Sequence, residues 1–323
     1  MICVVCTKWI PEECVEKYAS VFRFVCPKTP GAVFSRQELS EQLKQAEVLF
    51  SVAGTPIDKE LIETGENLKM IASLGVGYDH VDVAYATEKK IPVVNSPTAV
   101  SEPTAEHTIA LMMAIFHNLS RYTQHVKQGL WENDAFGTVQ TSIAGHTLGI
   151  VGMGRIGKHV AQKAASLGMN ILYSDLHRLP EAAEKELGAT YGTLQEVLAQ
   201  SDCVTVHVPF QKENYHLFDA QAFAAMQEGA YFINASRGAL MDINALTAAL
   251  KSGKIKGAAL DVFEPEPYLS GEILTLENVV LTPHVASETR SARVAMAFEC
   301  LDGILALSRG ETPSNLVNPS SVK

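Results

Sequence analysis

Three polar segments each follow an apolar run typical of a buried strand, and they supply an arginine, a glutamate and a histidine: Arg237, Glu266 and His284. The runs before them are Ala230–Ile233, Ala258–Leu260 and Val279–Leu281. Because the carboxyl ends of parallel strands meet at one edge of a sheet, we expect these side chains to share a ligand-binding edge. An arginine there can bind a carboxylate bidentately, and a histidine can transfer a proton near neutral pH.

The acid of this group has two candidates, Glu264 and Glu266, in a stretch whose prolines restrict the backbone and so hold the carboxylates in place. Glu264 fits a solvated acidic turn equally well. Of the ten histidines, only His284 shares its setting with both a candidate orienting acid and a candidate anion clamp. We interpret four others as structural: His107, His125, His159 and His216.

The stretch Leu148–Asp175 predicts a dinucleotide site. An apolar strand is followed by the spacing G-x-G-x-x-G, a helical pattern over Arg155–Leu167, a second strand and an acid. The three glycines are Gly152, Gly154 and Gly157. The first permits the tight turn, the second lets the backbone approach a pyrophosphate, and the third lets helix and strand pack closely. Free N–H groups at Arg155 and Ile156 would bind phosphate.

Asp175 stands 18 residues after Gly157, where a carboxylate accepts hydrogen bonds from the adenosine ribose hydroxyls and repels a 2′-phosphate. NAD is therefore the expected cofactor. The neighbouring Arg178 keeps NADP open, because an arginine can accept that phosphate. His207 and Pro209 follow another apolar run, Cys203–Val206, and we expect them to border the adenosine pocket without doing chemistry.

The composition is that of a globular enzyme with two domains, at 323 residues and 47% hydrophobic residues. A net charge of −10 gives no bulk attraction for nucleic acid, and no run is long and apolar enough to span a membrane. We interpret the N-terminus as a first strand and not as a signal peptide. The six cysteines, including the Cys3–Cys6 pair, are expected to be buried and reduced in the cytoplasm, and no metal site is expected.

Strand and helix patterns alternate along the chain, which predicts parallel sheets with crossover helices. The first hundred residues contain five strand patterns, at Ile2–Cys6, Val21–Val25, Val48–Val52, Met70–Leu74 and Pro92–Val94. One long helix is expected over Ser101–Gly129 and another over Ser291–Leu307. The predicted fold is two doubly wound, Rossmann-like α/β domains joined by two crossing helices, with a cleft between them. Residues 1–100 with 288–323 would form a flavodoxin-like substrate domain, and 101–287 an inserted NAD-binding domain.

Over essentially its whole length the chain resembles the D-isomer-specific 2-hydroxyacid dehydrogenase family. The resemblance rests on the segment Gly75–Asp82, the glycine fingerprint and the order of Arg237, Glu266 and His284. It implies that Arg237 binds the substrate, that His284 is the acid/base, and that Glu266, which directly precedes a proline, orients His284. It further implies roles at the substrate for the backbone of Val76 and Gly77, and at the cofactor for Thr104, Ala235 and Asp261.

The implied reaction is hydride transfer from NADH to the carbonyl carbon of a 2-oxo acid, with a proton from His284, in a homodimer. The substrate stays open among glyoxylate, hydroxypyruvate, 2-ketogluconate and branched or aromatic 2-oxo acids, with NADPH as the alternative reductant. The loop Ser51–Thr55 lacks the arginine expected of a phosphoglycerate enzyme. Glu266 argues against a formate dehydrogenase, which has an amide there. An NAD-sensing, corepressor-like binding protein is the alternative of a different class.

Overall fold

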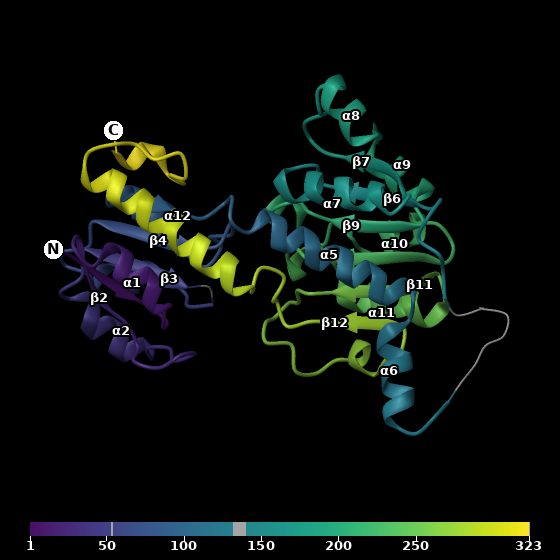
Figure 1. Ribbon diagram of the computed structural model, residues 1–323, viewed down its shortest axis with the longest axis horizontal. Coiled ribbons are helices and arrows are strands. Elements are labelled where there is room, and N and C mark those ends of the chain that lie inside the picture. Colours follow the sequence, from purple (N-terminus) through teal and green to yellow (C-terminus); the bar gives the residue numbers. More distant parts are fainter. Residues whose placement is uncertain (53, 132–139, 323) are drawn as a thin grey trace. The chain divides into compact units, whose positions relative to one another are not determined.

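The computed structural model describes residues 1–52, 54–131 and 140–322, so Ala53 of the loop after the third strand lies outside it. The chain divides into two compact units (Figure 1). The first consists of Met1–Val100 and Glu288–Lys323, and the second is the intervening Ser101–Ser287. No helix among the described residues has the length and apolar character needed to cross a membrane.

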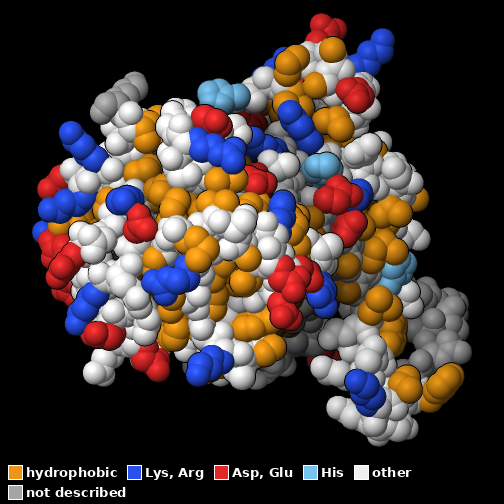
Figure 2. Space-filling model, turned by 60° about the vertical axis from the view of Figure 1, so that its left-hand side comes forward, with side chains coloured by type: hydrophobic (Ala, Val, Ile, Leu, Met, Phe, Trp, Pro, Cys, Tyr) orange, Lys and Arg blue, Asp and Glu red, His pale blue; other side chains and the backbone are white. Residues whose placement is uncertain are grey.

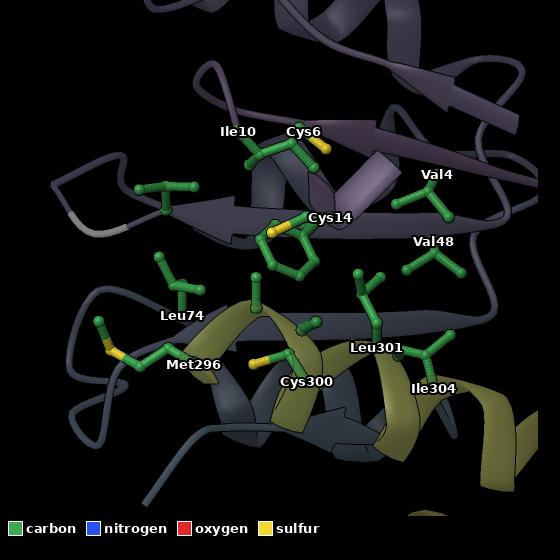
Figure 3. Close-up of a cluster of buried hydrophobic side chains, with 14 of the residues drawn as sticks. Val4, Cys6, Ile10, Cys14, Val48, Leu74, Met296, Cys300, Leu301 and Ile304 are labelled. Atoms are coloured by element: carbon green, nitrogen blue, oxygen red, sulfur yellow. The ribbon is translucent and has the colours of Figure 1, made fainter. Parts of the chain in front are cut away.

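The first unit is built on a five-stranded parallel sheet in the order β2-β1-β3-β4-β5. Its strands are β1 Ile2–Cys6, β2 Phe22–Val25, β3 Val48–Val52, β4 Met70–Leu74 and β5 Val93–Val94. Its helices are α1 Glu12–Tyr18, α2 Arg36–Leu43, α3 Lys59–Glu63, α4 Val83–Glu88 and α12 Arg290–Ser308. One apolar cluster fills the space between the sheet and α12, as Figure 3 shows for residues of β1, β3, β4 and α12. A second cluster covers the opposite face.

The second unit contains a seven-stranded parallel sheet in the order β12-β11-β10-β9-β6-β7-β8. Its strands are β6 Thr147–Val151, β7 Asn170–Ser174, β8 Ala189–Tyr191, β9 Cys203–Val206, β10 Ala230–Asn234, β11 Ile255–Leu260 and β12 Val279–Leu281. Its helices are α5 Ser101–Phe116, α6 Leu119–Lys127, α7 Arg155–Ser166, α8 Glu181–Leu187, α9 Leu194–Gln200, α10 Ala220–Ala225 and α11 Ile243–Ser252. Apolar clusters cover both faces. Strands β7 and β8 are added on one side of β6 and strands β9 to β12 on the other, so the carboxyl ends of β6 and β9 form the switch point where such sheets bind ligands.

The expectation of two doubly wound parallel sheets is confirmed, and most strands lie within a residue or two of their predicted bounds. The capping box of Ser35 and Glu38 and the cap at Asp242 are also present. The short strand β8 has no counterpart in the prediction. Charged side chains of both signs are mixed over the face that Figure 2 shows.

The prediction of one continuous helix over Ser101–Gly129 is wrong. The helix ends at Phe116, and a new one begins at Leu119. Asn118 separates them in the left-handed region, at φ 50°. Asparagine tolerates this conformation better than most residues, so the polar break interrupts an apolar stripe that alone suggested continuity.

Candidate active site

The glycine fingerprint forms a turn at the end of β6 in which two of the three glycines leave no room for a side chain. Gly152 has φ +101°, and a Cβ there would lie 2.7 Å from the carbonyl carbon of His207, which follows β9. A Cβ on Gly157 would lie 2.2 Å from the carbonyl oxygen of Gly152. In contrast, a Cβ on Gly154 would have no atom within 4 Å. The first and third glycines thus serve packing, and the second keeps open the space where a pyrophosphate would approach.

Helix α7 begins at this turn, with Gly154 as its N-cap. Gly154 contributes no capping side chain, so the first N–H groups of the helix, at Arg155 and Ile156, lack an intrahelical acceptor. The helix is twelve residues long, and its aligned peptide dipoles place partial positive charge at this end. The chain's own residues therefore fit the diphosphate of a dinucleotide at the switch point of the sheet.

Asp175 follows β7 and is held in one orientation by two backbone donors. Its Oδ2 accepts a hydrogen bond from the N–H of Met153 at 2.7 Å, and its Oδ1 accepts one from the N–H of His177 at 2.9 Å. Each carboxylate oxygen keeps a second lone pair for a ribose hydroxyl. The carboxylate is thus tied directly to the glycine turn through Met153.

Arg178, the residue that left NADP open, is engaged by Glu184 of α8. Its Nε and Nη2 donate to the two carboxylate oxygens of Glu184, both at 2.9 Å. The hydroxyl of Tyr173 donates to the same carboxylate at 2.7 Å. This parallel two-bond geometry is the strong form of an arginine–carboxylate pair. A 2′-phosphate would have to compete with Glu184 for this guanidinium.

The edge next to the fingerprint carries the predicted adenosine-side residues. The Nε2 of His207 lies 3.0 Å from the Oγ1 of Thr205, and burial lowers the pKa of His207 to about 3, so the ring is neutral. Pro209 is exposed and Ala235 is buried at the end of β10. The hydroxyl of Ser236 donates to the carbonyl of Val208 at 2.6 Å, which ties the loops after β9 and β10 together.

The structure brings His284 and Glu266 into direct contact. The Nδ1 of His284 lies 2.8 Å from the Oε2 of Glu266, and the backbone N–H of Phe263 donates to the Oε1 at 2.9 Å. Burial alone would raise the pKa of Glu266, but the hydrogen bonds from His284 and Phe263 and the positive charge of Arg237 outweigh it and hold that pKa below the usual 4.5. Glu266 is therefore ionised at neutral pH. The His284 side chain is 46% exposed, so its ring remains accessible to a ligand.

Arg237 comes from the end of the neighbouring strand β10 and lies close enough to act on the carboxylate of Glu266. Its carbonyl accepts from the Nδ2 of Asn234 at 2.9 Å, which fixes the turn. The next residue, Gly238, is buried, and a Cβ there would lie 2.0 Å from the carbonyl carbon of Phe263. The loops after β10 and β11 therefore touch backbone to backbone, and this contact places the arginine beside the glutamate.

His284 is held in an unusual backbone conformation, with φ 55°. Its N–H donates to the carbonyl of Asp261 at 2.7 Å. The side chain of Asp261 is fully buried and accepts hydrogen bonds from the next two backbone N–H groups, those of Val285 and Ala286, both at 2.9 Å. Left-handed backbone at a non-glycine residue persists only where its surroundings enforce it. Asp261 supplies that enforcement from the end of the adjacent strand.

Two further side chains complete the surroundings of the Asp261 carboxylate. The hydroxyl of Thr282 donates to its Oδ1 at 2.6 Å, and the Nε2 of His107, on α5, lies 3.5 Å from the same oxygen. Burial alone would raise the pKa of Asp261, but hydrogen bonds from His107, Thr282 and the two N–H groups outweigh it and keep that pKa below the usual 3.8. Asp261 is thus a buried, ionised carboxylate at the base of the His284 turn.

Sequence reasoning missed the connection of His107 and Thr282 to this network. Thr282 stands two residues before His284, so its position offered a signal. His107 offered none, because it precedes Asp261 by more than a hundred residues and reaches it only through the packing of α5. The interpretation of His159 as structural agrees with its ion pair to Glu102 at 2.8 Å. The Oε2 of Glu264 lies 3.8 Å from the Nε2 of His216, and the Glu264 side chain remains 45% exposed.

The predicted substrate residues Val76 and Gly77 lie in the first unit, on the turn after β4. The three carbonyls of this turn are occupied: that of Gly75 accepts from Ser96, that of Val76 from Asn95, and that of Gly77 from Ser73. The N–H groups of Val76 and Gly77 have no hydrogen-bond partner within the described part of the chain. The turn therefore presents two backbone donors without a partner among the described residues, while each of its carbonyls already accepts a hydrogen bond, which suits an anion.

Thr104 lies in the second unit, in the second turn of α5, and is buried. Its carbonyl accepts the hydroxyl of Thr108 at 2.8 Å, an ordinary bond within the helix. Three residues further along the same helix stands His107, which reaches the Asp261 carboxylate. The start of α5 is thus connected to the turn that carries His284.

Comparison with known proteins identifies the family. The NAD binding domain of D-isomer specific 2-hydroxyacid dehydrogenases matches residues 109–286. A glyoxylate reductase from Thermococcus litoralis is 40% identical over 320 residues, which cover 97% of this chain and 95% of the relative. The structure of a D-lactate dehydrogenase from Aquifex aeolicus, complexed with NAD and lactic acid, has a TM-score of 0.82 at 29% identity and covers 98% of this chain and 99% of its own.

An NADPH-dependent glyoxylate/hydroxypyruvate reductase from Sinorhizobium meliloti is also similar, with a TM-score of 0.86 at 28% identity over 99% of both chains. Both the family match and the relatives span the fingerprint, the arginine turn and the histidine turn described above. The chain therefore belongs to the D-isomer-specific 2-hydroxyacid dehydrogenase family and carries that family's NAD-binding domain within its second unit.

Proposed function

We propose that the protein reduces a small 2-oxo acid of the glyoxylate or hydroxypyruvate type to its 2-hydroxy acid, with NADH as the reductant and His284 as the acid. One observation carries the proposal: the ring of His284 is hydrogen-bonded through Nδ1 to an ionised Glu266, with Arg237 beside it. The pairing leaves Nε2 to face a substrate. The 40% identity to a glyoxylate reductase over nearly the whole chain supports the substrate class.

In this mechanism each residue acts on one part of the substrate. Bound nicotinamide supplies a hydride. Arg237 binds the carbonyl and carboxylate oxygens of the 2-oxo acid and stabilises the negative charge that develops during reduction. The N–H groups of Val76 and Gly77 bind the carboxylate. His284 donates its Nε2 proton to the carbonyl oxygen, and Glu266 stabilises the imidazolium that precedes this transfer.

The direct test is NADH consumption with a panel of 2-oxo acids: glyoxylate, hydroxypyruvate, pyruvate, 2-ketogluconate, a branched and an aromatic 2-oxo acid, and 3-phosphohydroxypyruvate. The highest kcat/KM is expected for glyoxylate or hydroxypyruvate. A preference for pyruvate or for the phosphorylated acid would overturn the substrate class while leaving the chemistry intact. No turnover with any of them would favour a binding protein that senses NAD.

Replacing Glu266 with glutamine should weaken reduction more at high pH than at low pH. The hydrogen bond and the positive charge of His284 lower the pKa of Glu266, and the same interaction acts in return on the imidazolium, so the glutamine removes a charge that favours the acid form. The measurement is the pH dependence of kcat for the 2-oxo acid. The matched control is Glu102→Gln, which removes the charge from another glutamate paired with a histidine at 2.8 Å. A pH profile of E266Q that superimposes on the parent's would contradict the role.

Asp175, whose charge repels a 2′-phosphate, and Arg178, which is already hydrogen-bonded to Glu184, support a preference for NADH over NADPH. The variant Asp175→Asn removes the charge that repels a 2′-phosphate, and we expect it to narrow the preference for NADH about tenfold, the equivalent of about 1.4 kcal/mol. The assay compares kcat/KM for the two cofactors. Asp202→Asn is the control, because Asp202 likewise accepts from a backbone N–H, that of Thr147, at the opposite end of β6. A parent enzyme that prefers NADPH would refute the assignment.

The remaining expectations concern assembly and location. We propose a homodimer, supported by the apolar side chains exposed along and just after α6: Leu119, Val126, Leu130 and Trp131. Sedimentation of the purified protein measures the assembly directly. We also propose a cytoplasmic location, supported by six cysteines that are all free thiols.

A further inference from the structure

The N-terminal cysteines are arranged differently from what their spacing suggests. Cys3 and Cys6 form a C-x-x-C sequence, but both lie in β1, where side chains alternate between the two faces of the sheet. Cys3 belongs to the apolar cluster on one face and Cys6 to the cluster on the other. The two thiols of the C-x-x-C sequence therefore point away from each other.

Cys6 instead has a neighbour on the adjacent strand. β1 and β2 are parallel, and their register pairs Val4 with Phe24 and Val5 with Val25. β2 ends at Val25, and extending the same register by one residue along both chains would place Cys26 beside Cys6. Neighbouring strands lie about 4.8 Å apart, within the Cα separations of about 4.4–6.8 Å at which disulfides form. Cys26 packs against the same apolar cluster as Cys6, the cluster drawn in Figure 3.

The two thiols affect each other's pKa, and their environments differ. Cys6 is fully buried, and burial, followed by the bond with Cys26, raises the pKa of its thiol. Cys26 is only partly buried, and the hydrogen bond from Cys6 lowers the pKa of its thiol. The thiolate is the reactive form of cysteine. The pair thus combines a partly buried cysteine whose thiol ionises more readily with a fully buried cysteine of the same apolar cluster.

We propose that Cys6 and Cys26 form a reversible disulfide when the protein meets a peroxide. The Cys26 thiolate attacks one oxygen of hydrogen peroxide, the O–O bond breaks, and the products are a sulfenic acid on Cys26 and, after protonation, water. The Cys6 sulfur then attacks the Cys26 sulfur and loses its proton, and the sulfenic hydroxyl leaves as a second water. Two thiols are oxidised by two electrons and one peroxide is reduced.

This disulfide would join the ends of β1 and β2, from which two paired segments of the first unit continue. β2 is the edge strand of its sheet, and the chain after Cys26 returns to pair with the residues after Cys6. Two backbone hydrogen bonds connect these segments. The N–H of Trp9 donates to the carbonyl of Ala32 at 3.0 Å, and the N–H of Phe34 donates to the carbonyl of Thr7 at 3.1 Å. The disulfide would close a ring at the base of these contacts. A cross-link over some twenty residues stabilises a fold chiefly by restricting the unfolded chain.

Peptide mapping tests the proposal on the whole protein. The native enzyme is treated with hydrogen peroxide, free thiols are blocked with N-ethylmaleimide, and trypsin releases residues 1–8 and 24–28. We expect these two peptides to be joined, the joined mass to disappear after reduction, and fragmentation to place the bond at Cys6. We also expect the oxidised protein to melt several degrees higher, reversibly.

Variants separate this pair from the neighbouring thiols. Cys3→Ser is the matched control, because Cys3 lies in the same tryptic peptide as Cys6. This variant should still form the cross-link. Cys26→Ser, at a partly exposed position, should abolish both the joined peptide and the rise in melting temperature. A bond from Cys26 to Cys3 or to Cys14, which lies in the same cluster as Cys6, would overturn the assignment. Oxidation of Cys26 to sulfinic acid without any cross-link would overturn the proposal as a whole.

Discussion

Replacing His284 with alanine should lower kcat for reduction of the 2-oxo acid by about 10²–10⁴-fold, the usual contribution of a positioned general acid. The ring contacts Glu266 through Nδ1 at 2.8 Å, and its side chain is 46% exposed, so it can hold a proton and still reach a ligand. Without it, the alkoxide formed by hydride transfer would have to take its proton from water. KM should change less than kcat, because Arg237 and the turn after β4 retain their donors.

The experiment must distinguish loss of the general acid in His284→Ala from a general disturbance of the fold in that variant. His159→Ala is the matched control, since His159 forms the same Nδ1 to Oε2 contact with a glutamate at 2.8 Å and is exposed to a similar degree. That variant should keep the parent's kcat. Cofactor binding, followed by quenching of protein fluorescence on addition of NADH, should persist in H284A. A loss of less than about tenfold in kcat would remove His284 from the proton-transfer step.

The parts of the site that the sequence predicts best are those in which one local segment does the work. The fingerprint is an example: strand, glycine turn and helix are contiguous, and the geometry at Gly152 and Gly157 follows from that order. The contact between Glu266 and His284 is less local, yet it could be anticipated because both follow neighbouring strands. The alternation of strands and helices likewise gave the two parallel sheets, since crossover connections leave few other arrangements.

Other features could not be anticipated because they depend on packing between distant segments. Arg178 is hydrogen-bonded to Glu184 because helix α8 places that glutamate beside it. Only this side-chain geometry distinguishes Arg178 from an arginine that is free to bind a phosphate. The placement of Cys26 beside Cys6 is inferred from strand register, which a C-x-x-C pattern within one strand obscures. The left-handed backbone of Asn118 divides what periodicity presents as a single helix.

The resemblance implies a role for Asp261 at the cofactor, which stays a prediction. The structure adds a second role for this residue, and it leads to the second large effect. In the structure, its two carboxylate oxygens accept from Thr282, Val285 and Ala286, the residues around His284. We therefore infer that Asp261 positions the histidine turn. Its pKa lies below the ordinary value, so its stabilising contribution is present above about pH 4 and is lost as the pH falls through its folded-state pKa.

The variant Asp261→Asn should lower the free energy of unfolding by on the order of 3 kcal/mol and reduce kcat at the same time. One carboxamide oxygen cannot accept from all three donors, and its NH₂ group would face a backbone N–H in a buried site. The turn would then lose the hydrogen bonds that hold His284 at φ 55°, so activity should fall at temperatures where the variant is still folded.

Asp242→Asn is the control for this variant. Asp242 also accepts from two backbone N–H groups, but as an N-cap, where asparagine serves equally well. Urea unfolding and kcat measured well below the transition separate the two effects, and the acid-induced loss of stability should be shallower in D261N than in the parent. Full activity in a folded D261N enzyme would mean that the turn keeps its shape without the carboxylate, and that Asp261 contributes to stability alone.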